Sequence, residues 1–352
     1  MLFAEILMMD QKKVRASSEC LSSASSDDES ISSSATSLFD LSPDKLHEEL
    51  APHKLSLDAL QENGYPMWDE ITQTVYFEQS RLNRSDWFAN DDFLRKCARC
   101  NKPVVLNHDG SLNSKPCRYH YRPKWDPVSN TKLLHCCYTT PGTSKGCRRE
   151  NSHVFYGAWE DTLLDFVTTP TASSDSDFRS KKVYALDVET VFTLNGMECG
   201  RVSLVDHKGT VTVDVTVLPA YPIIDFNYDF SGLSMADMHN AISLEDCRRR
   251  LFEFINKDTL LIGHSLESDL KALRLVHENV LDTSILFAAQ KRSGKQTKLS
   301  LKNLAAAHLG KVIQGGAVGH SSVEDAAICM ELLSKFHADN RQIIEKETLK
   351  TD

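Results

Sequence analysis

The hydrophobic pattern after residue 181 leaves few folds open to this chain. Short β-branched runs separated by glycine-containing turns predict three strands of an antiparallel meander, at residues 183–188, 201–206 and 210–217. Another buried strand is predicted at 259–262. Helical spacing is found at 244–255, 266–276, 301–309 and 323–336. Strands followed by alternating helices and strands predict an α/β fold in which helices flank a mixed sheet.

Composition divides the rest of the chain. Residues 16–37 are dominated by Ser, and such a segment cannot bury enough apolar surface to offset its loss of chain entropy. A second polar run at 168–180 is typical of a linker. We therefore expect, in chain order, a disordered Ser/acidic segment, a cysteine-rich module with a flanking aromatic stretch, a linker, the α/β domain and a tail, at residues 1–50, 51–165, 166–180, 181–340 and 341–352.

Membrane insertion is not expected. No apolar run approaches the roughly 20 residues that a membrane span needs. The apolar residues 2–9 lack the basic start and the small-residue cleavage site of a signal peptide. The sequence therefore predicts an intracellular protein with no membrane partner.

Charge is distributed unevenly in a chain with a formal net charge of −9. Residues 95–149 hold twelve Lys or Arg against two Asp. No acidic residue lies between Asp282 and Glu324, a stretch with six Lys or Arg. Two solvated faces would explain these basic islands, and so would a polyanionic partner such as a nucleic acid.

Acidic residues mark the ends of several predicted elements. Asp187 and Glu189 end the first strand, where period-two alternation places both on one face. Asp269 begins a predicted helix, with Ser265 as a plausible N-cap. Asp325 falls in the first turn of the last helix, where Ser321 and Glu324 have capping-box spacing. One Asp-x-Glu pair occurs often by chance, but four acids in this arrangement do not.

A histidine accompanies these acids. His320 directly precedes the last helix and follows Gly315, Gly316 and Gly319, which allow close approach to a ligand. Hydrolysis of a phosphodiester by two Mg²⁺ or Mn²⁺ ions needs oxygen ligands of this kind. An imidazole can accept a proton from water near neutral pH. Four carboxylates and one His therefore indicate a metal-dependent phosphodiesterase.

Four segments also resemble the motifs of a known family. They are Tyr184-Ala-Leu-Asp-Val-Glu189, Gly196-Met-Glu-Cys-Gly-Arg-Val202, Leu261-Ile-Gly-His-Ser-Leu-Glu-Ser-Asp-Leu270 and Gly319-His-Ser-Ser-Val-Glu-Asp-Ala326. These segments are similar to the motifs of the DEDDh 3′→5′ exonucleases, in particular the Rex branch of RNA exonucleases. The resemblance covers about residues 182–336.

The resemblance implies an RNase H-like fold and an enzyme that removes nucleoside 5′-monophosphates from RNA 3′ ends. By that match the metal ligands for two Mg²⁺ or Mn²⁺ ions are Asp187, Glu189, Asp269 and Asp325. His320 would be the general base, and Asp282 would have a supporting role. Single-stranded RNA 3′ ends are the implied partner, and the nucleus is the implied location.

A second group of residues has the spacing of zinc ligands. Six of the ten cysteines and two histidines form it: Cys97, Cys100, Cys117, His120, Cys136, Cys137, Cys147 and His153. Cys-x-x-Cys and Cys-x-x-His steps in an intracellular chain favour zinc over disulfides, and eight ligands make two tetrahedral sites. His108 and His135 are further candidates, so the ligand pairing stays open. The region resembles the Cys/His module of metazoan Rex-type exonucleases and, more distantly, the two-zinc CHORD module.

The basic run between the third and fourth acids is predicted to contact RNA phosphates. Its members would act as point charges without reading bases. They are Lys291, Arg292, Lys295, Lys298 and Lys302. Two other functions stay open, a non-catalytic zinc-dependent RNA or protein adaptor and a DNA-directed exonuclease. The sequence identifies neither the RNA species nor the oligomeric state, nor the role of the Ser-rich segment.

Overall fold

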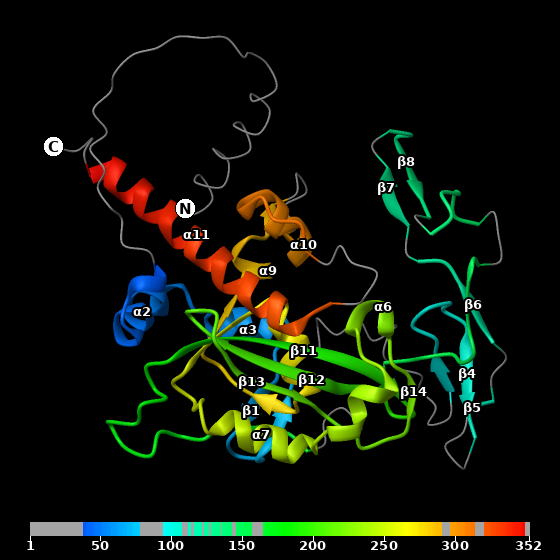
Figure 1. Ribbon diagram of the computed structural model, residues 1–352, viewed down its shortest axis with the longest axis horizontal. Helices are drawn as coiled ribbons and strands as arrows, with labels where there is room; N and C mark the ends of the chain where they lie inside the picture. Colours follow the sequence, from blue (N-terminus) through cyan, green and yellow to red (C-terminus); the bar gives the residue numbers. More distant parts are fainter. Residues whose placement is uncertain are drawn as a thin grey trace, which may run out of the picture. The chain divides into compact units, whose positions relative to one another are not determined.

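The computed structural model (Figure 1) describes most of the chain after residue 37. The described residues are 38–77, 94–107, 112–113, 116–121, 123–126, 128–134, 136–142, 146–156, 165–290, 296–313 and 320–348. The serine-rich residues 16–37 and the glycines before His320 lie outside them. No helix among the described residues combines the length and the apolar character that a membrane span requires.

A mixed sheet of six strands forms the centre of the α/β domain. Its order is β13-β12-β11-β15-β17, and β14 pairs with β11. The strands are β11 (Val183–Thr193), β12 (Gly196–Asp206), β13 (Val211–Thr216), β14 (Ile223–Asp225), β15 (Leu260–Gly263) and β17 (Val280–Asp282). The first three are antiparallel neighbours, and β15 and β17 continue the sheet in parallel with β11. The predicted meander and mixed sheet are confirmed. The hydrophobic pattern did not predict β14 or β17, each of which has three residues.

Helices cover both faces of this sheet. The main ones are α7 (Leu244–Phe252), α8 (Leu266–Ala272), α10 (Leu301–Leu304) and α11 (Ser322–Thr348). Successive side chains of β11 point to opposite faces. Tyr184 and Leu186 pack with residues of α7 and α8, whereas Val183 and Ala185 pack with residues of α10 and α11. A strand buried on both sides explains why β11 is apolar at consecutive positions.

Several predicted helices have other bounds in the structure. The helix predicted at 266–276 ends at Ala272 because Arg274 has a left-handed φ of 52°. The following residues form β16 (Leu275–Val276), which pairs in parallel with β10 (Val167–Thr168). The segment 301–309 divides into α10 and a π-helix, Ala305–Leu309. Helix α7 ends three residues before position 255, and α11 continues to Thr348, into the predicted tail.

Two predicted irregular segments are ordered in part. Residues 38–50, within the range predicted to be disordered, contain η1 (Leu38–Asp40) and α2 (Pro43–Leu50). That part of the prediction is wrong because Leu46 and Leu50 are buried in the core beneath α11. The predicted linker contains β10, so it is tied to the α/β domain by strand pairing.

The remaining elements are short. Before the cysteines lie η2 (Ala51–His53), α3 (Leu57–Glu62) and the hairpin of β1 (Met67–Asp69) and β2 (Thr74–Tyr76). The Cys/His module, residues 94–156, holds β3 (Leu94–Lys96), β4 (Pro103–Leu106), β5 (Leu112–Asn113), β6 (Cys117–Tyr119), β7 (Lys124–Asp126), β8 (Thr131–Leu133) and β9 (Arg148–Glu150). The α/β domain also contains α6 (Tyr228–Ser231), η3 (Met235–Asn240), α9 (Thr283–Leu286), β18 (Ala289–Gln290) and β19 (Gln296–Thr297).

Candidate active site

Three elements bring the four predicted carboxylates into one cluster, in which Asp187 is half-buried and the other three are buried. Asp187 and Glu189 lie on β11, just beyond its pairing with β15. Asp269 comes from α8 and Asp325 from the first turn of α11. The exposed fractions of Glu189, Asp269 and Asp325 are 7%, 8% and 3%. Buried carboxylates whose charges repel one another are costly without a compensating cation.

Close packing places Asp269 against β11. The Val188 N–H donates a hydrogen bond of 2.8 Å to Asp269 Oδ1. Helix α8 can approach this closely because Gly263, at the end of β15, has no side chain. A Cβ there would lie 2.5 Å from Leu266 Cδ1 and 3.1 Å from the Leu186 carbonyl oxygen.

Asp282 supports the same region from the end of β17. Ser265 occupies the N-cap position of α8 as predicted, but it has a left-handed φ of 60° and its side chain makes no capping bond. Asp282 caps this helix instead, accepting the N–H groups of Ser265 and Leu266 at 3.0 and 3.1 Å. The Tyr65 hydroxyl also donates to Asp282, at 2.6 Å. A tyrosine ahead of the Cys/His module thus braces the helix that carries Asp269.

The carboxylates in this cluster strongly affect each other's protonation. Burial, and next the neighbouring Asp325, raise the pKa of Asp187 well above its usual value. Burial, and next Asp187, raise the pKa of Asp269 in the same way. The pKa of Glu189 is raised to about 9 by burial and then by Asp187 and Asp325. Without added positive charge, Glu189 would retain its proton at neutral pH, and Asp187 and Asp269 would keep theirs to a higher pH than exposed aspartates do.

His320 lies beside the carboxylates. Its Nδ1 is 3.6 Å from Asp325 Oδ2. Its backbone N–H donates to the Phe230 carbonyl at 2.7 Å, and the two rings meet edge to face with centroids 6.0 Å apart. Burial, and then the charge of Lys302, lower the imidazole pKa. The ring is therefore neutral at pH 7 and able to accept a proton.

The donor set fits divalent cations. Oxygen or nitrogen atoms of Glu189, His320 and Asp325 lie within 4.8 Å of one another. Among the described residues, no group donates a hydrogen bond to the buried Glu189 Oε1. A buried carboxylate oxygen without a donor, among acids with raised pKa values, is the environment that an oxygen-seeking ion such as Mg²⁺ would satisfy.

The eight predicted zinc ligands gather into two groups of four. The first is Cys97, Cys100, Cys117 and His153, and the second is His120, Cys136, Cys137 and Cys147. The structure thus separates the neighbours Cys117 and His120, whose spacing resembles that of a shared site. His108 and His135 lie outside the described residues.

Distances inside the two groups suit zinc. A tetrahedron with Zn–S bonds of about 2.3 Å separates two sulfur ligands by about 3.8 Å. Cys97 Sγ and Cys117 Sγ are 3.7 Å apart, and Cys100 Sγ lies 3.3 Å from His153 Nδ1. In the second group, the Sγ atoms of Cys136 and Cys137 are each 3.5 Å from His120 Nδ1. All of these cysteines are free thiols.

Two members of the predicted phosphate-binding run are described, and both act on the site. Lys298 forms an ion pair of 3.1 Å with Glu267, two residues before Asp269. The charge of Lys302 lowers the pKa of His320. Lys291, Arg292 and Lys295 lie outside the described residues.

Sequence reasoning missed Tyr65 and Phe230. Tyr65 contacts an acid 217 positions later in the chain, and Phe230 contacts His320 from the short helix α6, which has no motif. No local pattern signals such contacts, because spacing along the chain carries no information on them.

Comparisons with known proteins agree with this geometry. The exonuclease family RNase_T matches residues 185–333. The putative RNA exonuclease pqe-1 of Caenorhabditis elegans is 40% identical over 83% of this chain and 18% of its own length. The human RNA exonuclease 1 homolog is 36% identical over 84% of this chain and 24% of its own length. This chain thus spans less than a quarter of either relative.

Among solved structures, the Pan2 catalytic unit of Neurospora crassa is similar with a TM-score of 0.43 and 18% identity. This likeness covers 82% of this chain and 48% of that one.

A further sequence relative, RNA exonuclease 3 of Candida albicans, is 32% identical over 70% of this chain and 60% of its own length. The chain therefore carries an exonuclease domain of the RNase_T family and is a homologue of proteins named RNA exonucleases.

Proposed function

We propose that this chain is a 3′→5′ exoribonuclease that releases nucleoside 5′-monophosphates from single-stranded RNA, with two Mg²⁺ or Mn²⁺ ions. The observation that carries the proposal is the convergence of four interacting carboxylates, three of them buried, beside a neutral imidazole. The names of the relatives support RNA as the substrate. Divalent ions would polarise the scissile phosphate and promote ionisation of the attacking water.

The protein's own groups have distinct tasks in this proposal. The four carboxylates, at positions 187, 189, 269 and 325, would hold the ions. His320 accepts the proton of the attacking water on its imidazole, which the lowered pKa keeps unprotonated. Lys298 and Lys302 add positive charge where phosphates would arrive, because Lys298 lies near Asp269 through Glu267 and Lys302 acts on His320.

Cleavage of labelled oligonucleotides tests the activity. The chain is incubated with 5′-labelled single-stranded RNA or DNA of one sequence, with Mg²⁺, Mn²⁺ or excess chelator. We expect a ladder of RNA shortened from the 3′ end, only with metal. Asp187→Asn should reduce the rate by orders of magnitude. His320→Ala should reduce it about 10² to 10⁴ fold with little change in RNA binding.

The same assay separates the other functions. Faster shortening of DNA than of RNA would indicate a DNA-directed exonuclease. Tight RNA binding without shortening in any metal would indicate the adaptor. Exposed Asp175 offers a control, since Asp175→Asn removes a carboxylate outside the cluster and should leave the rate unchanged.

We also propose that the Cys/His module binds two structural Zn²⁺ ions, with the ligand sets found above. Support comes from the tetrahedron-like distances and from a very small apolar core around Cys97, Val104, Cys117 and Tyr119. Metal binding would then supply much of the folding free energy of the module. Mass spectrometry of the native protein should find about two zinc ions for eight ligands. Cys97→Ser should lose one of them, and an active preparation without zinc would contradict the proposal.

A nuclear role in RNA processing is proposed on the family resemblance alone. Microscopy of the tagged chain in cells is its test. Exclusion from the nucleus would contradict it.

A further inference from the structure

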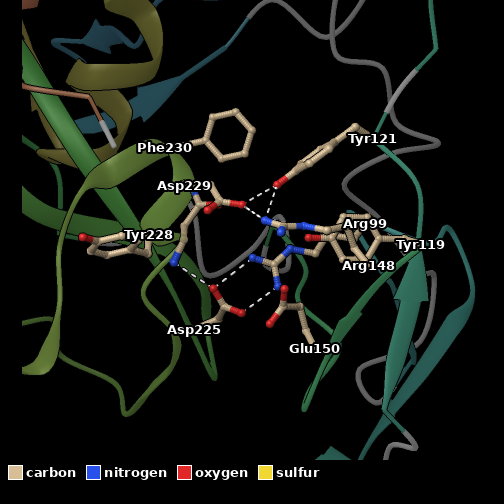
Figure 2. A pocket seen from close by; sticks show the side chains of 10 residues that line it. Arg99, Tyr119, Tyr121, Arg148, Glu150, Asp225, Tyr228, Asp229 and Phe230 are labelled. Atoms are coloured by element: carbon tan, nitrogen blue, oxygen red, sulfur yellow. Dashed lines mark hydrogen bonds and ion pairs between the residues drawn. The ribbon is translucent and has the colours of Figure 1, made fainter. Parts of the chain in front are cut away.

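A seam joins the Cys/His module to the segment 225–230, which runs from the end of β14 into α6 (Figure 2), around a cavity of about 200 Å³. Arg99 of the module donates two hydrogen bonds to the two carboxylate oxygens of Asp225, at 2.6 and 2.9 Å. Arg148 donates to Asp229 and, at 2.8 Å, to the Tyr121 hydroxyl. Tyr121 in turn donates to Asp229.

These contacts hold the Cys/His module against the segment 225–230 of the α/β domain. Each arginine already faces an aspartate, so the cavity offers little uncompensated positive charge to an anionic ligand. The Arg99–Asp225 pair is largely sequestered, with side-chain exposures of 13% and 17%. Bidentate pairs of this kind fix orientation as well as distance.

The seam reaches the candidate catalytic histidine through one residue. Phe230 accepts the backbone N–H of His320 at 2.7 Å, and its ring contacts the His320 ring. The Phe230 ring also meets the ring of Tyr121 in the module, with centroids 6.3 Å apart and planes at 77°. Figure 2 shows Phe230 and Tyr121 projecting toward each other above Asp229. A continuous set of contacts thus runs from the module to His320.

Both candidate zinc clusters have a neighbour in this seam. Arg99 lies between Cys97 and Cys100, and its N–H donates to Cys97 Sγ at 3.4 Å. Arg148 directly follows Cys147. The two arginines that hold the segment 225–230 are therefore adjacent in the chain to the cysteines of the two clusters.

We propose that the Cys/His module is a positioning element for His320. Arg99 and Arg148 hold the segment 225–230, and Phe230 then fixes the backbone and ring of His320 beside Asp325. This inference rests on the proposed exonuclease function for its kinetic consequence. Misplacement of a reacting group by a fraction of an ångström to 1 Å costs up to about 10² fold in rate.

Variants on the two sides of the seam test the proposal. We expect Arg99→Ala and Asp225→Ala each to lower kcat by about 10 to 100 fold, with KM for single-stranded RNA changed less. Because the two residues act through one contact, the double variant should be little worse than either single variant. Arg149→Ala removes the same charge from an exposed position beside Arg148 and should keep kcat.

A second measurement does not depend on activity. Hydrogen exchange of the His320 amide, which donates to Phe230, should become faster in Arg99→Ala and in Asp225→Ala but not in Arg149→Ala. Asp225 lies outside the Cys/His module, so Asp225→Ala should keep its zinc. If Arg99→Ala loses zinc and unfolds the module, the Asp225→Ala variant alone decides whether the seam positions His320.

Three outcomes would overturn the inference. In one, both seam variants match Arg149→Ala in kcat and in amide exchange. In another, KM rises while kcat and exchange stay constant, which would make the seam an RNA contact. The third is full additivity in the double variant. If the wild-type chain cleaves no RNA, the proposed function fails, and the exchange measurement still decides whether the module positions His320.

Discussion

At the scale of single residues, the candidate site is defined by carboxyl groups whose pKa values are raised by burial and by one another. Glu189 is the clearest case, because burial and two neighbouring aspartates raise its pKa to about 9. A carboxyl with a raised pKa keeps its proton to a higher pH in the folded chain than in the unfolded one. The folded site is therefore prepared to exchange protons for metal.

This exchange gives a measurable prediction. Binding of Mg²⁺ or Mn²⁺ at pH 7.5 should release protons, because the ligands must ionise. Calorimetric titration in buffers of different ionisation enthalpy measures the number released. Affinity should rise with pH up to about 9, the pKa of Glu189. Glu189→Gln should release fewer protons, and a binding heat that is independent of the buffer would contradict the assignment.

At the scale of elements, α8 depends on a residue from outside the α/β domain. Its N-terminal N–H groups are capped by Asp282, and Asp282 is held by Tyr65 from the segment after α3. Tyr65 and Asp282 are both fully buried. The N-terminal segment is thus part of the support of Asp269.

Tyr65→Phe tests this support. The substitution keeps the ring but leaves a buried carboxylate without one donor, which should lower the free energy of unfolding by about 1 to 3 kcal/mol. Urea unfolding followed by circular dichroism measures the change. Tyr76→Phe is the matched control, since the Tyr76 hydroxyl accepts a hydrogen bond from Gln61 on the exposed surface and should cost less. Equal effects of the two substitutions would show that the Asp282 contact is unimportant.

The elements also show how far local sequence reaches. The pattern at 183–217 predicted the meander because alternation is a property of neighbouring residues. It missed β17, whose three residues are too few to show a period. It also made α8 too long, because the left-handed turn at Arg274 has no sequence signal as strong as glycine.

At the scale of the whole molecule, a chain with a net charge of −9 must still attract RNA. The acid-free stretch between Asp282 and Glu324 joins the end of β17, where Asp282 supports the site, to α11, which carries Asp325. We therefore assign phosphate contacts to its basic residues. Changing Lys291, Arg292 and Lys295 together to Ala should weaken binding about equally for all RNA sequences. It should also lower the salt slope by about 2, at roughly 0.7 per contact on single strands.

Affinity measured from low to high salt checks this prediction. The control replaces three exposed lysines near the beginnings of β17, β11 and β15, namely Lys54, Lys208 and Lys257. It changes the net charge equally, so it separates local contacts from the overall field. The same affinity and salt slope in both triple variants would show that the basic run is only a solvated face.

The sequence by itself determined which groups the site contains. Four acids, one histidine and eight zinc-ligand candidates are identified by residue type and short spacing, because metal chemistry demands particular donor atoms. Strand and helix periods also follow from neighbours along the chain.

Only the tertiary structure decided how these groups are combined. It separated Cys117 from His120 into different clusters, placed Asp282 at the start of α8, and brought Arg99 to Asp225, 126 positions away. The reason is physical: burial and contacts between distant segments depend on how layers pack, and a one-dimensional pattern does not encode a partner so far along the chain.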